Sequence, residues 1–309
     1  MSIIGYERPS LVFQFLSFIY RYVVRVLLRY FRQLLTGKSD IERILDGDHK
    51  HQAEVTAQVK CLIDEKELPF VPSDWTESEE EDLADYVVEA ECQKTGDKGV
   101  GVIRENFKKS LAQIRGIRRL CAVVEELRAE KYDRNNPKHE KKLLKLWQLL
   151  MPNVELCDRK SSQWEEIGFQ GQDPATDFRG MGILALEQLL FFSQFDHENA
   201  CRILTLSHHP AIGFPMAVVG ISLTALIRLL LMDGHLNNHF YNTANSAPTL
   251  DNFHHAYCRL FVLFAEVWKR ERPSSLMYFN EFKDRFSQNL IEYLSTESAD
   301  LDELDAEML

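Results

Sequence analysis

The chain has 309 residues, of which 45% are hydrophobic and 27% are charged, and this composition excludes an intrinsically disordered protein. The formal net charge of −11 argues against nucleic acid as a partner, because that function normally requires a basic surface. Prolines and glycines are few for this length, and no segment has a convincing strand pattern. We therefore predict an all-α protein with a compact multi-helix domain and a separate amphipathic N-terminal helix.

The cysteines and histidines indicate neither disulfides nor a metal site. The six cysteines lie far apart and include no CxxC pair, which is typical of reduced thiols in an intracellular protein. The ten histidines include pairs, but none has the glutamate or cysteine partner of a zinc motif. We therefore predict a cytoplasmic protein without a bound metal. Association with a membrane or with mitochondria stays open, because of the N-terminal segment.

That segment, residues 11–35, is strongly apolar and carries four arginines on one helical face: Arg21, Arg25, Arg29 and Arg32. No acidic residue occurs between Glu7 and Asp40, and no small-residue cleavage site follows the apolar run. An interfacial membrane helix or a mitochondrial-type presequence fits this pattern. A helix that docks on the protein's own core with solvated arginines fits it equally well.

A helical lead-in is predicted over residues 39–129. Residues 41–68 have the pattern of one polar, amphipathic helix, and a capping box formed by Thr76 and Glu79 predicts a second helix that runs to Cys92. Residues 95–101, TGDKGVG, predict a turn. Apolar residues at intervals of three and four predict a long helix over 103–134. Residues 104–145 carry 13 bases against six acids, which is typical of a solvated face but also suits an acidic partner or anionic lipid.

Further helices are predicted in the second half of the chain. Their expected ranges are 138–151, 183–195, 197–207, a charge-free core segment over 211–227, and two closing helices with aromatic stripes over 250–270 and 276–294. Residues 211–227 approach the length of a membrane span, but Gly213, Pro215 and Gly220 favour a buried helix. We expect a polar loop over 234–247 and a flexible acidic tail over 295–309.

One stretch differs from everything around it. Residues 164–182, WEEIGFQGQDPATDFRGMG, contain four glycines together with aromatic and acidic residues. Asp173-Pro174 predicts a helix or turn start, and Thr176 or Asp177 can cap a helix that runs to Phe195. Arg179 would then lie in the first turn of that helix, where a cation is unfavourable. The alternatives are a functional arginine and a salt bridge from Arg179 to Asp173 or Asp177.

This stretch resembles the signature of the ELMO domain, and the chain resembles the short ELMO-domain-containing proteins over about residues 130–294. The resemblance implies an all-α ELMO-type domain that activates GTP hydrolysis by Arf-family, in particular Arf-like, small GTPases. The arginine of the family's DFR triplet corresponds to Arg179, which becomes the predicted catalytic arginine finger. GTP and Mg²⁺ would belong to the partner GTPase, so we predict no cofactor for this chain.

The resemblance also suggests roles for the residues around Arg179. We predict partner-binding or positioning roles for Trp164, Gly168, Phe169, Gln170, Asp173, Asp177 and Gly180. The two aspartates would position Arg179, the glycines would give access, and the aromatic rings would pack the loop. The sequence offers no substrate site of the chain's own, so whether the activator counts as an enzyme stays open. The alternative function is a non-catalytic helical adaptor in which Arg179 is structural.

Overall fold

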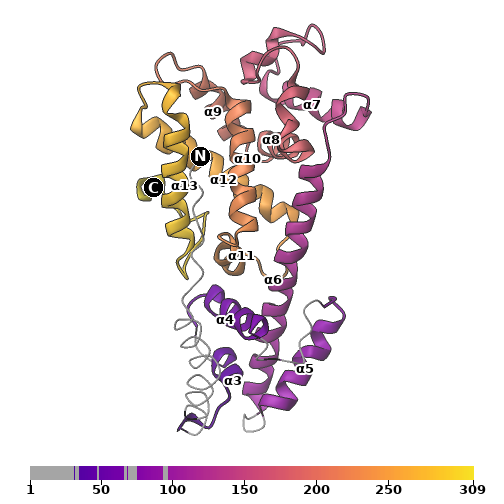
Figure 1. The fold of residues 1–309 in the computed structure, drawn as a ribbon, viewed down its shortest axis with the longest axis vertical. Coiled ribbons are helices and arrows are strands. Elements are labelled where there is room, and N and C mark those ends of the chain that lie inside the picture. The colour runs from indigo at the N-terminus through magenta and orange to yellow at the C-terminus, as the bar shows by residue number, and fades with distance from the viewer. Residues whose placement is uncertain (1–30, 32–34, 47–48, 66–67, 69–74, 93–96) are drawn as a thin grey trace, which may run out of the picture. The chain divides into compact units, whose positions relative to one another are not determined.

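The structure is a computed structural model built from helices (Figure 1). It describes residues 31, 35–46, 49–65, 68, 75–92 and 97–309. These residues form no strand, and the prediction of an all-α protein is confirmed. The amphipathic helix predicted over residues 11–35 lies almost entirely outside the described residues and stays a prediction.

The described chain divides into two compact units. Unit 1 contains the described residues up to His49 together with 58–110, and unit 2 contains residues 50–57 and 111–309. The α-helices are α3 (Asp40–Leu45), α4 (Gln52–Asp64), α5 (Glu79–Glu91), α6 (Asp97–Ala129), α7 (Pro137–Leu150), α8 (Gly182–Phe195), α9 (His197–Ser207), α10 (Met216–Met232), α11 (Asn237–Thr243), α12 (Leu250–Glu271) and α13 (Phe279–Leu294). Unit 2 is wider at both ends than the domain predicted over 130–294, and those limits stay a prediction.

Two helices replace the single one predicted over residues 41–68. The side chain of Ser39 accepts a hydrogen bond from the Glu42 N–H at 3.1 Å, and the Glu42 carboxylate accepts one from the Ser39 N–H at 2.9 Å. This capping box starts α3, which ends after Leu45, and α4 begins only at Gln52. The prediction of a single helix was wrong, since α3 ends with Asp46 as its C-cap, whose N–H donates to the Glu42 carbonyl at 2.9 Å.

The capping box predicted at Thr76 and Glu79 is only half formed. The Glu79 carboxylate accepts the Thr76 N–H at 2.7 Å, but the Thr76 hydroxyl donates to the same carboxylate instead of capping the helix. The Glu79 N–H already donates to the Thr76 carbonyl at 3.1 Å, so it does not reach the hydroxyl. The helix α5 therefore begins at Glu79 without a side-chain cap.

The long central helix α6 starts earlier and ends earlier than predicted. It begins at Asp97, so most of the turn expected over 95–101 is helical. Glycine costs only about 1 kcal/mol in a helix, which is too little to stop one that buries Ile103 and Phe107. The helix ends at Ala129, and the Glu130 carbonyl accepts the Ile183 N–H at 2.8 Å instead of continuing the helix.

Unit 2 is organised around α8, which contacts α7, α9, α10 and α12 (Figure 1). The predicted aromatic stripes lie in its core: Phe261, Phe264 and Trp268 on α12 and Phe282 and Phe286 on α13 are all buried. Ring centroids of Trp268 and Phe282 lie 4.9 Å apart in an edge-to-face arrangement. Burial of such rings is the main source of stability in a helical core.

The apolar helices α8 and α10 pack inside unit 2, as predicted for residues 183–195 and 211–227. Buried residues surround most of α8, whereas α10 buries one side and leaves Leu229 on its other side half exposed. No single helix of the described residues is long and apolar enough to cross a membrane. Only α10 taken together with α11 meets that test, and these two helices meet at a bend of 84°.

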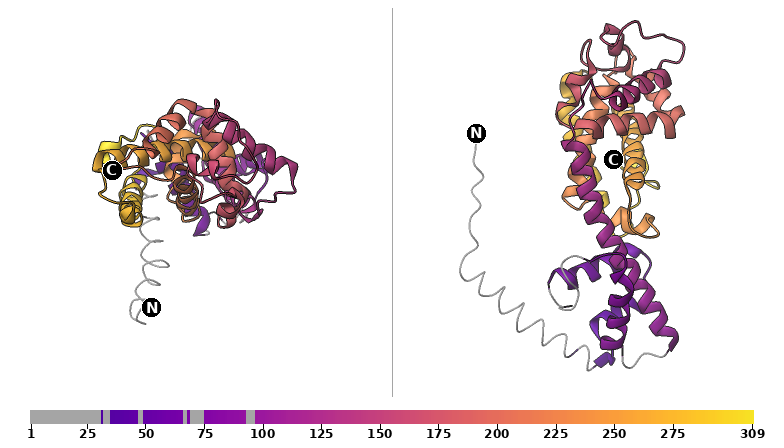
Figure 2. Two further views of the ribbon diagram at one scale, coloured as in Figure 1. Left: turned by 90° about the horizontal axis from the view of Figure 1, so that it is seen from above. Right: turned by 90° about the vertical axis from the view of Figure 1, so that its right-hand side faces the viewer.

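The end of the chain differs from its prediction. The polar loop expected over 234–247 contains the short helix α11, which buries Phe240 and Tyr241. The acidic segment 295–309, expected to be flexible, lies beside α12 and α13 (Figure 2). It buries Leu301 and Leu304 among its acids. The count of acids misled the prediction, because Ala299, Leu301, Leu304 and Leu309 are buried even though most of the residues around them are polar.

Candidate functional site

The glycine-rich stretch forms a loop between α7 and α8 that contains two short 3₁₀ helices. The first, η2, spans Ser162–Ile167 and ends at Gly168, whose φ of +87° favours glycine. A side chain at Gly168 would place its Cβ 2.2 Å from the Met216 nitrogen, so the loop lies directly against the start of α10. The second, η3, spans Pro174–Arg179 and is capped by the Asp173 side chain, which accepts the Ala175 N–H at 3.2 Å.

Buried aromatic rings hold this loop to the core. Trp164, Phe169 and Phe178 are each less than 5% exposed. They continue a row of rings that runs from Trp147 to Tyr132, with centroid distances between neighbours of 5.3, 5.8, 5.6 and 5.3 Å. The prediction that these three side chains pack the loop agrees with their burial. These buried rings therefore hold the loop backbone against the core.

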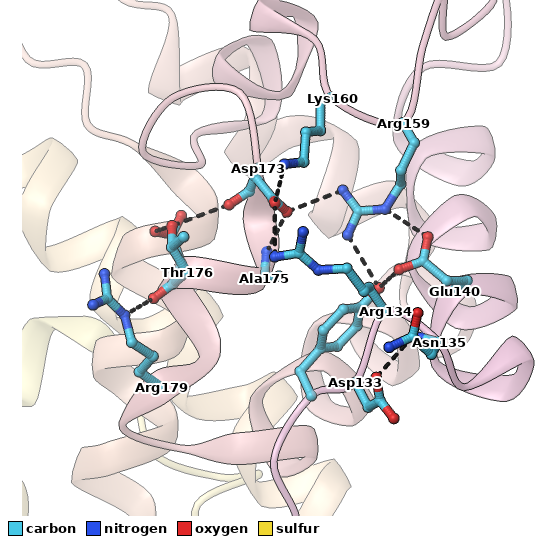
Figure 3. Close-up of polar contacts among 12 residues, drawn as sticks. Asp133, Arg134, Asn135, Glu140, Arg159, Lys160, Asp173, Ala175, Thr176 and Arg179 are labelled. Atoms are coloured by element: carbon cyan, nitrogen blue, oxygen red, sulfur yellow. Dashed lines mark hydrogen bonds and ion pairs between the residues drawn. The ribbon is translucent and has the colours of Figure 1, made fainter.

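Asp173 is the centre of a polar cluster beside the row of rings (Figure 3). Its carboxylate lies 3.2 Å from a terminal nitrogen of Arg159, 3.4 Å from one of Arg134 and 3.6 Å from the Lys160 ammonium. Burial alone would raise the pKa of Asp173. The hydrogen bond from Ala175 and the charges of Arg159 and Arg134 outweigh burial and lower it. Asp173 is thus an ionised anchor for the start of η3.

Arg159 and Glu140 connect Asp173 to α7. The Arg159 Nε–H donates to the Glu140 carboxylate at 2.5 Å, and the Tyr132 hydroxyl donates to the same carboxylate at 2.5 Å. Burial and this carboxylate raise the pKa of Tyr132, so the phenol stays protonated and donates. We did not predict Tyr132, Glu140 or Arg159 as site residues. All three lie outside the signature in sequence, and nothing local to them indicates the cluster.

Asp177 fixes the turn of the loop that precedes η3. Its carboxylate accepts the Gln170 N–H at 2.7 Å and the Thr176 hydroxyl at 3.2 Å. Burial raises the pKa of Asp177, and these two hydrogen bonds oppose that rise. The backbone of Gln170, rather than its exposed side chain, therefore makes the contact to Asp177.

Arg179 lies at the exposed end of η3, pointing away from the Asp173 cluster (Figure 3). Its Nε–H donates to the Thr176 carbonyl at 2.7 Å. Among the described residues, its two terminal nitrogens have no hydrogen-bond or ion-pair partner. The next residue, Gly180, is also exposed, and a Cβ added there would meet nothing within 4 Å. The tip of the loop thus presents a tethered guanidinium to solvent.

The predicted position of Arg179 was wrong, and the salt bridge considered as an alternative is not observed. It is the last residue of η3 and not in the first turn of α8, so its charge does not oppose a helix dipole. Asp173 pairs with three other cations, and Asp177 with backbone and hydroxyl donors, so neither forms the salt bridge to Arg179 that we considered. Gly182, the first residue of α8, has φ +56° and lies against the Arg128 and Glu130 carbonyls. That glycine serves internal packing and not access.

The described part of the chain holds no group of three histidine, cysteine or acidic side chains that could bind a metal ion. The loop presents a permanently charged planar donor, supported from behind by buried rings and a paired carboxylate.

An all-α unit with this loop points to the ELMO domain, and the comparisons agree. A sequence profile of the ELMO/CED-12 family matches residues 122–283. ELMO domain-containing protein 2 of Bos taurus is 36% identical over 279 residues, which cover 89% of this chain and 93% of the relative. ELMO domain-containing protein 1 of Mus musculus is 36% identical over 287 residues, covering 86% and 87%. ELMO domain-containing protein B of Dictyostelium discoideum is 34% identical over 289 residues, covering 89% and 95%.

The chain belongs to the ELMO/CED-12 family, which confirms the resemblance noted from the signature. The relatives are matched over most of their own length, as expected for the short members of the family.

Proposed function

We propose that this protein activates GTP hydrolysis by a small GTPase of the Arf family, with Arf-like members as the favoured partners, and that Arg179 acts as its arginine finger. The observation that carries the proposal is the state of the guanidinium. Its Nε–H is held by the Thr176 carbonyl, while the terminal nitrogens face solvent from the end of a rigid loop. The family resemblance supplies the reaction and the class of partner.

An arginine is suited to this reaction because negative charge spreads over the phosphate oxygens as the terminal phosphoryl group transfers. The partner GTPase holds the GTP and the Mg²⁺, and it usually positions the attacking water. An arginine supplied by a second protein contributes about 10³ to 10⁵ in rate. Guanidinium provides two parallel N–H donors with a permanent charge, and an ammonium group lacks that fork.

The loop around Arg179 supports this role because it restricts the conformations of Arg179 before a partner binds. Phe178 is 1% exposed, so the residue before Arg179 is fixed in the core. Asp173 fixes the start of η3, and Asp177 fixes the preceding turn through Gln170. Fewer conformations of Arg179 are then lost when a partner binds, which favours both affinity and rate.

The test is single-turnover GTP hydrolysis by a panel of purified Arf and Arf-like GTPases, with and without the full chain. We expect wild-type protein to accelerate at least one of them, and Arg179→Lys to lose about 10³-fold or more of that acceleration. Arg202→Lys, an exposed arginine on α9, is the matched control and should retain full activity. Equal acceleration by wild type and Arg179→Lys would disprove the arginine finger.

The adaptor alternative makes a different prediction in the same experiment. A non-catalytic module would bind a GTPase without changing its hydrolysis rate, and Arg179→Ala would lower the melting temperature if the side chain were structural. We expect Arg179→Ala to change the free energy of unfolding by less than about 0.5 kcal/mol, because the side chain is exposed and makes one hydrogen bond.

A further inference from the structure

The outer face of α7 carries a row of lysines that the proposed activity does not use. Lys138, Lys141 and Lys145 are spaced by three and four residues, so they lie on one side of the helix. All three are exposed. The opposite side of α7 is buried and consists of His139, Leu143, Leu146, Trp147 and Leu150. The lysine row therefore points directly away from the core of unit 2.

No carboxylate neutralises this row. Among the described residues, none of the three lysines forms an ion pair or a hydrogen bond through its side chain. The acids nearest to them on α7 and α8 have other partners: Glu140 binds Arg159 and Tyr132, and Glu187 binds Lys142. The row is a site of uncompensated positive charge on a chain whose net charge is −11.

The fold gains nothing from these charges. Lys138 lies in the first turn of α7, where the helix dipole disfavours a cation. Lys141 and Lys145 are four residues apart, as are Lys138 and Lys142, and like charges at that spacing destabilise a helix. A row of charges that opposes local stability suggests a role outside the folded unit.

We propose that the lysine row of α7 binds an anionic lipid bilayer. Lysine clusters on a helix are attracted to anionic headgroups, and each basic residue near such a surface contributes severalfold in affinity. Lysine is depleted from the centres of protein interfaces, which favour tryptophan, tyrosine and arginine, and none of these lies on the row. Leu144, beside Lys141 and Lys145, is 39% exposed and adds apolar contact at headgroup depth.

The test measures binding of the full chain to vesicles by co-sedimentation. Vesicles of phosphatidylcholine alone are compared with vesicles that contain about 30% phosphatidylserine. The variant replaces Lys138, Lys141 and Lys145 by glutamine. A control variant replaces Lys109, Lys269 and Lys283 by glutamine, which removes the same charge from other parts of the chain.

We expect wild type and control to prefer the phosphatidylserine vesicles, and the α7 variant to lose that preference by about tenfold or more. About 0.5 M salt should remove most of the wild-type preference, because it shortens the range of surface charge to a few ångströms. The melting temperature of the α7 variant should equal or exceed that of wild type, since its like-charge pairs are gone.

Three results would overturn the proposal. The first is equal binding of wild type to both kinds of vesicle, and the second is an equal loss of binding in the α7 and control variants. The third is unchanged vesicle binding by the α7 variant together with weaker stimulation of a GTPase in solution. That last result would assign the row to an acidic protein surface. Vesicle binding does not depend on Arg179, so this test and the hydrolysis assay fail independently.

Discussion

Two segments of unit 2 outside the long helices, the loop 151–181 and the C-terminal segment 295–309, are both held against the core, but they use arginine in opposite ways. In the C-terminal segment, the arginines come from the core. Arg259 on α12 donates to the Leu301 carbonyl at 3.0 Å and to the Leu304 carbonyl at 2.5 Å. In the loop, Arg179 is tethered by a backbone carbonyl three residues away and its terminal nitrogens face solvent.

The amino-acid composition of a segment therefore does not determine whether it is ordered or whether it is available to a partner. The glycine-rich loop is fixed by buried rings, and the acid-rich segment by two buried leucines and donated hydrogen bonds. A partner can bind an arginine only where the N–H donors of its guanidinium are not already bonded within the fold, as at Arg179.

The row of rings is expected to be the strongest anchor. Trp164 is fully buried, and its indole N–H donates to the Arg159 carbonyl at 3.0 Å. Trp164→Ala should lower the free energy of unfolding by about 3–5 kcal/mol, measured by urea denaturation. Trp164→Phe retains a ring and should lose less. An effect of Trp164→Ala below about 1 kcal/mol would show that the loop does not depend on this row.

The C-terminal segment should contribute through its buried leucines. Leu304 is fully buried, and Leu304→Ala should lower the free energy of unfolding by about 3 kcal/mol. Met308, 66% exposed in the same segment, is the control, and Met308→Ala should be neutral. If both substitutions are neutral in urea denaturation, the segment is not docked and the expectation of a flexible tail was right.

Two glycines of the loop should respond in opposite ways to alanine. Gly168 has φ +87°, and its added Cβ would lie 2.2 Å from backbone of α10, so Gly168→Ala should cost at least about 2 kcal/mol. The backbone of Gly180 is not in the left-handed conformation, and the space around it is open. Gly180→Ala should therefore change the free energy of unfolding by less than about 0.5 kcal/mol. Thermal unfolding of the pair measures this contrast, and equal losses would contradict the close approach at Gly168.

The smallest effect concerns acid pH. The pKa of Asp173 is lowered in the fold, so its ionised form stabilises the fold above its unfolded pKa. That contribution is lost as the pH falls through the folded value, below about pH 4. Loop amides around Ala175 should then lose protection against hydrogen exchange, measured relative to the intrinsic exchange rate at each pH, and Asp173→Asn should remove this pH dependence of protection. Asp284→Asn, at an exposed position on α13, should not. A loop whose protection does not change with acid in wild type would disprove the anchor.

Much of this fold follows from local pattern in the sequence. Apolar spacing located α7, α8, α9 and α12 closely, because each of these helices buries a face or most of its surface. The charge-free segment predicted over 211–227 is helical only from Met216, the residue after Pro215, and α10 runs on to Met232. The errors occur where contacts between residues far apart in sequence determine the structure. The helix α6 ends where the backbone carbonyls at its end lie against Gly182, and α11 forms because Phe240 and Tyr241 are buried in the core. In the loop, the signature located Arg179 and Asp173, but their environments depend on Arg159 and Tyr132, which no local rule connects to them.

The hydrogen bond that holds Arg179 allows two properties of its side chain, the positive charge and the geometry of its donors, to be separated by experiment. The fold uses only the Nε–H, so the cationic charge and the four terminal N–H donors remain for a partner. A lysine at this position has a single nitrogen, which can either donate to the Thr176 carbonyl or extend toward a partner. A methyl group on a terminal nitrogen of Arg179 would keep the charge and the tether and remove one donor. At this position, recognition by charge and recognition by geometry can therefore be measured one at a time.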